Sequence, residues 1–148
     1  MGLPTAAIMT AAILRYRADI TLRGLLVGST APTWNIFDAD GMPVNQPFPY
    51  VVISIPVEQS GAGLVMGTDG VDSYLYASTF TQTGASGGCA QARGIAAQLY
   101  YLTHPKPFDL EASGFSQFFC LFQDKHEVPQ QDGITQMIVQ RFKLMTQG

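Results

Sequence analysis

The run Gly-Ala-Ser-Gly-Gly at residues 84–88 matches the Gly-x-Ser-x-Gly pattern of a nucleophile elbow. In that motif a serine hydroxyl sits on a sharp turn between a strand and a helix, where backbone N–H groups can stabilise an oxyanion. Asp109 or Asp124, followed by His126, would complete a triad in the chain order Ser, Asp, His. One hypothesis is therefore a small serine hydrolase that uses Ser86 as its nucleophile.

The same run also has a simpler interpretation. Glycine and serine are common at any strand-to-helix turn, where Ser86 would cap the helix N-terminus. An α/β-hydrolase also needs a parallel sheet with crossover helices, and a chain of 148 residues with the element order below has room for only one such crossover. We therefore favour a structural turn, and we expect neither catalytic residues nor an enzyme.

A second glycine-rich segment spans residues 58–70. Its spacing, with Gly61, Gly63 and Gly67, misses the Gly-x-Gly-x-x-Gly pattern by one position, and no lysine follows as in a P-loop. The segment instead has an apolar tip, formed by Leu64, Val65 and Met66. Such a tip is unfavourable in water and favourable when it docks on a partner, so we predict a partner contact here. A surface loop without a partner is the alternative.

A second candidate contact is the polar stretch 124–131, chiefly Asp124, Lys125, His126 and Glu127. The two histidines and two cysteines of the chain are far apart and lack metal-ligand spacing, so we expect no metal and no cofactor. With only Cys89 and Cys120, reduced thiols are the default expectation, and one disulfide remains an alternative.

Composition narrows the function classes. A length of 148 residues fits a single domain, residues 1–148. Charged residues make up 13% of the chain, against about 25% in average soluble domains, which is typical either of a polar-neutral or secreted protein or of a subunit that hides surface in an assembly. The excess of 11 acidic over 8 basic residues argues against a nucleic-acid binder. No segment is long and apolar enough to span a membrane, and no secretory signal is expected, because the first arginines follow the apolar run 6–14.

Hydrophobic periodicity predicts the elements that would position these residues. A helix is expected over 5–27, with Met9, Ile13, Tyr16 and Ile20 as its apolar stripe. The other expected elements are strands at 50–57 and 71–83, a helix at 89–103, and strands at 115–123 and 134–145. Consecutive strands on short connections predict an α+β domain: a mainly antiparallel sheet of about four strands with two helices packed on one face.

The ordered set of elements and short motifs resembles the tail terminator (tail-completion) proteins of long-tailed bacteriophages. The resemblance rests on the leading helix, on Phe-Pro-Tyr-Val-Val-Ile at 48–53, and on the second strand, Tyr-Leu-Tyr-Ala-Ser at 74–78. A following helix at 90–102 and the Asp132-Gly133 turn into the last strand complete it. It spans nearly the whole chain, and it carries over no catalytic residues.

This resemblance implies a structural virion protein made in the host cytoplasm. Its subunits would form a homo-oligomeric, hexameric ring that caps the head-proximal end of the tail tube, ends tube polymerisation and joins the tail to the neck. The implied partners are further copies of the chain, the tail tube protein and a neck or head-completion protein. Genomic DNA would pass through the lumen without specific binding, which acidic lumen residues would favour. Another ring component of the head–tail neck is the alternative.

Overall fold

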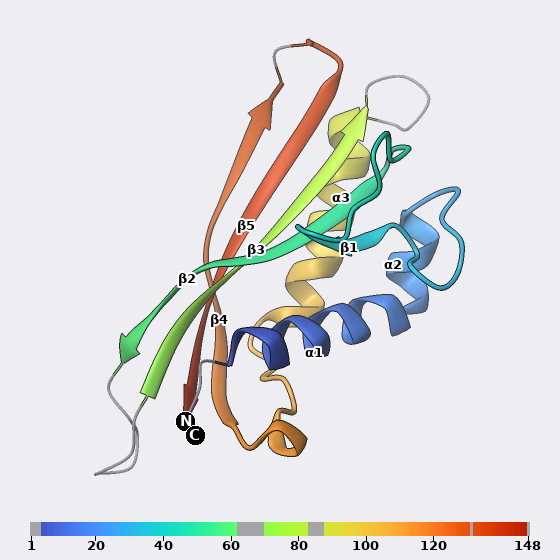
Figure 1. Ribbon diagram of the computed structural model, residues 1–148. Coiled ribbons are helices and arrows are strands. Elements are labelled where there is room, and N and C mark those ends of the chain that lie inside the picture. Colours follow the sequence, from blue (N-terminus) through green and yellow to red (C-terminus); the bar gives the residue numbers. More distant parts are fainter. Residues whose placement is uncertain (1–3, 62–69, 83–87, 131, 148) are drawn as a thin grey trace.

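The computed structural model describes residues 4–61, 70–82, 88–130 and 132–147 (Figure 1). Its elements, in chain order, are α1 (Thr5–Ala18), α2 (Ile20–Leu25), β1 (Ile36–Asp38), β2 (Tyr50–Gly61), β3 (Gly70–Gln82), α3 (Gly88–Thr103), the 3₁₀ helix η1 (Glu111–Ser113), β4 (Ser116–Pro129) and β5 (Thr135–Gln147). The predicted strand at 71–83 and the predicted helix at 89–103 are confirmed almost to the residue.

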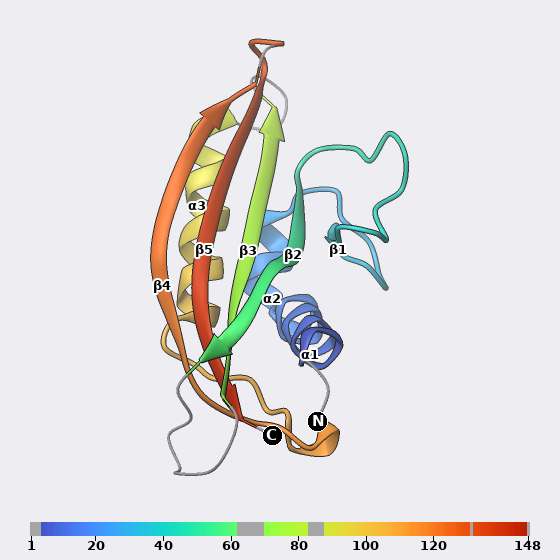
Figure 2. The same ribbon diagram turned by 60° about the vertical axis from the view of Figure 1, so that its left-hand side comes forward.

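Within the described residues the strands form one five-stranded sheet in the order β1-β2-β3-β5-β4. All neighbours are antiparallel except β1 and β2. The α+β prediction is confirmed, but the expected number of about four strands is one too low, because β1 has three residues and is too short to show a periodic pattern. The helices α1, α2 and α3 lie on one face of the sheet (Figure 2).

The N-terminal segment forms two helices, so the prediction of one helix over 5–27 is wrong. Asp19 interrupts it with extended backbone (φ −81°, ψ 116°), and its carboxylate accepts a hydrogen bond from the backbone N–H of Leu22 at 2.8 Å. Asp19 is thus the N-cap of α2. Aspartate is favoured at this position because its carboxylate accepts a hydrogen bond from a backbone N–H group at the start of the helix. The break turns Ile20 outward, to 79% exposure, and the buried stripe is Ile8, Ala12 and Tyr16.

Two strands extend further than the hydrophobic pattern predicts. β2 continues to Gly61, so the segment 58–61 belongs to the sheet, and β4 continues to Pro129, so the stretch 124–129 is a strand and not a loop. β4 extends because it pairs with β5, and this pairing joins backbone groups from Asp124 to Pro129 whatever their side chains are. Because β4 lies at an edge of the sheet, its polar side chains remain in water and leave no hydrophobic signal.

The core fills the space between the sheet and the helices. Its fully buried members include Tyr16, Leu75, Leu99 and Phe142. The Tyr16 hydroxyl and the Thr103 hydroxyl form a hydrogen bond of 2.6 Å that joins α1 to the end of α3. This bond satisfies both buried hydroxyls, as burial of polar groups requires.

The two thiols differ in their surroundings, and both are free. Cys120 is fully buried, and burial raises the pKa of its thiol to about 12, whereas Cys89 at the start of α3 is half-buried.

Since the thiolate is the reactive species, we expect Ellman's reagent to titrate one thiol in the native protein and both after unfolding in guanidinium chloride. A Cys89→Ser variant should lose the native reaction. Rapid native reaction of that variant would contradict the buried position of Cys120.

Candidate functional site

The predicted contact residues Asp124, Lys125, His126 and Glu127 lie on β4, the edge strand, and point to two different faces. Register with β5 pairs Asp124 with Arg141 and His126 with Val139 on the face away from the helices. Lys125 pairs with Gln140 and Glu127 with Ile138 on the helix face. Of the other predicted contact residues, Gly61 ends β2, while Gly63, Leu64, Val65 and Met66 lie outside the described residues.

The hydrolase hypothesis gains no support from the described residues. Ser86 lies outside them. The His126 Nε2 is 3.8 Å from the Asp124 Oδ2, but that oxygen is hydrogen-bonded to the Arg141 guanidinium at 2.6 Å, and the histidine side chain is 68% exposed. The sheet is also antiparallel apart from the short β1–β2 pair, which is not the parallel sheet that a nucleophile elbow requires.

A groove lies between α3 and β4 on the helix face of the sheet, with a volume of about 430 Å³. This α3–β4 groove is lined by Arg93, Ala96, Ala97, Tyr100, Phe122, Lys125 and Gln140. Its apolar part is held by an edge-to-face contact between the rings of Tyr100 and Phe122, whose centroids are 5.3 Å apart. Gln140 is buried, and its Nε2 donates to the Ala96 carbonyl at 2.9 Å.

The rim of the α3–β4 groove carries net positive charge. Arg93 Nε donates to Glu127 Oε1 at 2.6 Å, and this hydrogen bond lowers the pKa of Glu127 and keeps its carboxylate ionised. That pair is neutral as a whole. Lys125 is exposed and forms no ion pair within the part of the chain that the structure describes. Its charge also lowers the pKa of Glu127, and with Arg93 it gives the rim two cations against one carboxylate.

The opposite edge of the sheet carries unpaired acidic residues. Asp38, Asp40 and Glu58 form no ion pair with any described residue. Glu58 is partly buried: its Oε1 accepts a hydrogen bond from the Thr5 hydroxyl, and its Oε2 is shielded from water. The Asp38 Oδ1 accepts hydrogen bonds from the backbone N–H groups of Asp40, at 2.9 Å, and Gly41, at 2.6 Å, which fixes the turn out of β1. The Asp40 side chain is exposed at the start of the segment 39–49, which we call the β1–β2 loop.

The β1–β2 loop also exposes apolar side chains. Val44 is 89% exposed and Met42 is 37% exposed. The loop is nevertheless tied down, because Asn35 Nδ2 donates to the Pro49 carbonyl at 2.9 Å and Gln46 Nε2 donates to Asn35 Oδ1 at 3.2 Å. The signal that the sequence offers for this surface is the pair of apolar residues on either side of Pro43.

Among the described residues no helix is long and apolar enough to cross a membrane. The same residues contain no cluster of three or more histidine, cysteine, aspartate or glutamate side chains able to hold a metal ion.

No protein-family model matches the chain, and no curated protein sequence matches it. The fold is similar to that of a chain in a solved structure described as the virion of a native gene transfer agent (GTA) particle. The two chains superpose with a TM-score of 0.76 at 21% sequence identity, over 97% of this chain and 96% of the other. At this identity the likeness shows a shared fold.

Proposed function

We propose that this chain is a structural virion protein. Its copies form a ring, a hexamer, that caps the head-proximal end of a phage tail tube, ends polymerisation of the tube and joins the tail to the neck. The observation that carries the proposal is the fold likeness to a chain of a phage-like particle over nearly the full length of both chains. The sequence resemblance to tail terminators, which is independent of that superposition, supports the same role.

The distribution of charge and apolar surface agrees with a ring subunit. A closed ring needs two different, complementary surfaces on each subunit, and this chain has dissimilar surfaces at opposite edges of its sheet. A low content of charged residues, 13%, suits a protein that buries much of its surface in contacts. The role we propose is non-enzymatic and needs no cofactor, and DNA passes through the lumen without specific binding.

The proposal is tested by mass and by capping. Light scattering over a concentration series, with negative-stain images, should detect a ring with a central hole and a mass near six times 16.0 kDa. Purified tail tubes mixed with the protein should stop growing and carry the ring at one end. If the protein instead binds only a head-side connector, it is another component of the neck. Tubes that continue to grow, without bound protein, would exclude the capping role.

The segment 62–69 is the proposed contact with the tube. Replacing Leu64, Val65 and Met66 together by serine should weaken tube capping at least 100-fold, since each apolar side chain buried in a contact contributes about 1.5–3 kcal/mol. The thermal unfolding midpoint should not change. Capping is measured as the protein concentration that halts tube growth. The control replaces Ile20 and Val27, exposed apolar residues in and beside α2, by serine, and it should cap normally; equal capping by both variants would refute the tube contact.

A further inference from the structure

We propose that the α3–β4 groove of one copy of this chain receives the β1–β2 loop of the next copy. In this contact Asp40 lies against Lys125, and Met42 and Val44 cover the apolar part of the groove. The inference rests on the proposed ring, and it names the surfaces by which neighbouring subunits recognise each other.

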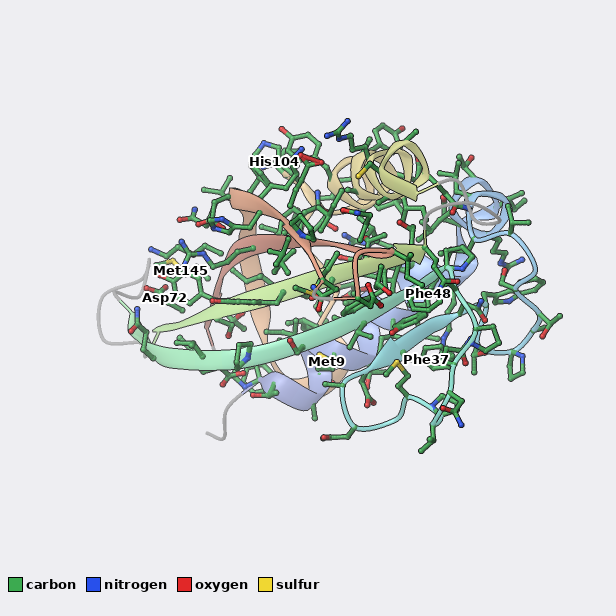
Figure 3. The ribbon with its side chains drawn as sticks, turned by 90° about the horizontal axis from the view of Figure 1, so that it is seen from above. Met9, Phe37, Phe48, Asp72, His104 and Met145 are labelled. Atoms are coloured by element: carbon green, nitrogen blue, oxygen red, sulfur yellow. The ribbon has the colours of Figure 1, made fainter. Side chains whose placement is uncertain are left out.

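The two surfaces lie at opposite edges of the same sheet. β1 is the first strand and β4 the last in the order β1-β2-β3-β5-β4, and in Figure 2 the β1–β2 loop and β4 form opposite borders of the molecule. Figure 3, viewed from above, likewise separates Phe37, next to the loop, and Phe48, within it, from His104, which directly follows α3. A contact between two different patches is head-to-tail, which is the type that closes rings.

The charges on the two surfaces are complementary. Asp40 gives the β1–β2 loop an exposed carboxylate with no ion pair among the described residues, beside the partly buried carboxylate of Asp38. The groove contributes Lys125, which is likewise unpaired there, beside the neutral Arg93–Glu127 pair. Complementary charges of this kind set the orientation of a contact and disfavour pairing of two like edges. The carboxylate of Asp40 therefore fits beside Lys125 at the groove and is repelled by the same carboxylate of a second loop.

The apolar groups are complementary as well. Ala97, Tyr100 and Phe122 leave an apolar surface in the groove, with Tyr100 40% exposed. Val44, at 89% exposure, is the large hydrophobic side chain that the loop leaves most open to water. The hydrogen bonds of Asn35 hold the loop in place before docking, which lowers the entropic cost of binding.

Charge reversal tests the contact. Lys125→Glu and Asp40→Lys each place like charges together at every interface of a ring, so each variant alone should associate about tenfold more weakly or worse. In an equimolar mixture the two variants can alternate around a ring. At one interface the introduced carboxylate meets the introduced ammonium group, and at the next the native Lys125 meets the native Asp40. Alternating rings should therefore form. The double variant should also associate by itself. Association is measured as the light-scattering mass at a series of protein concentrations. The control for net charge is Lys106→Glu, which changes an exposed residue outside the groove.

The outcomes separate this contact from the proposed function. Loss of association in both single variants, with recovery in the mixture and in the double variant, establishes the contact, because recovery also shows that the chains are folded. Rings that form unchanged in both single variants overturn the contact and leave tube capping standing. Loss in the single variants without recovery overturns it in favour of another partner. A wild type that stays monomeric up to millimolar concentration overturns it as well, and tube capping is then judged by its own assay.

Discussion

A variant with Met42→Ser and Val44→Ser should remain monomeric at concentrations where the wild type forms rings. Val44 is 89% exposed and Met42 is 37% exposed, and neither belongs to the buried core, so their replacement leaves the core of the subunit in place. In the proposed contact they cover the apolar part of the α3–β4 groove. Each apolar side chain of this size contributes about 1.5–3 kcal/mol when buried, so the double replacement should weaken association about 100-fold or more.

The test compares two equally polar variants. Ile20→Ser with Val27→Ser removes two side chains that are 79% and 65% exposed but lie outside both proposed surfaces. We expect light scattering to find rings for this control and monomers for the Met42 and Val44 variant, with the same unfolding midpoint in both. A loop variant that assembles like the wild type contradicts the contact. So does a control that is equally impaired, because general loss of apolar surface would then explain the effect.

The sequence predicts the elements with strong local signals. From residue 74 to 81, β3 alternates partly exposed residues, among them Tyr74, Tyr76 and Phe80, with buried ones, and Pro105 and Pro107 stop α3 close to Thr103. These features depend only on residues near each other in the chain. Hydrophobic periodicity did not predict the break at Asp19, because the apolar stripe continues through Ile20. In the structure the capping hydrogen bond of Asp19 ends the first helix in spite of that stripe.

The candidate site was harder to predict because it is a property of the assembled sheet. Lys125 was singled out as part of a polar loop, yet it lies in one groove with Arg93 only because β4 pairs with β5 and packs next to α3. Met42 and Val44 could equally have been core residues. Their exposure follows from the short β1 strand, whose parallel pairing with β2 sends the connecting segment away from the core.

The arginines of the N-terminal segment bind backbone groups. Arg15, Arg17 and Arg23 are three of the eight basic residues of the chain. In the structure each donates to backbone carbonyl groups: Arg17 to that of Ile36, and Arg23 to that of Arg17. Their role is to connect the N-terminal helices to the strands and loops around them.

Arg15 is the strongest of these connections. Its Nη1 donates to the carbonyl oxygens of Leu102 at 3.1 Å and Lys106 at 2.8 Å, and its Nη2 donates to that of Pro107 at 2.7 Å. The guanidinium also stacks on the Phe108 ring, 4.0 Å from its centroid. One planar group thus fixes the turn after α3 against α1, which no other cationic side chain can do with the same geometry.

Replacing Arg15 by lysine should therefore destabilise the domain although the charge is kept. A lysine can reach one of the three carbonyl groups and cannot stack in the same way, so we expect the free energy of unfolding to fall by about 2–4 kcal/mol, allowing for solvent screening at a half-buried site. Urea unfolding followed by circular dichroism measures the change. The control is Arg93→Lys: Arg93 pairs with a carboxylate at the surface, so this replacement should leave the free energy of unfolding unchanged within the error of the measurement. Equal stability of the two variants would mean that charge alone, and not the fork of hydrogen bonds, holds α1 to the end of α3.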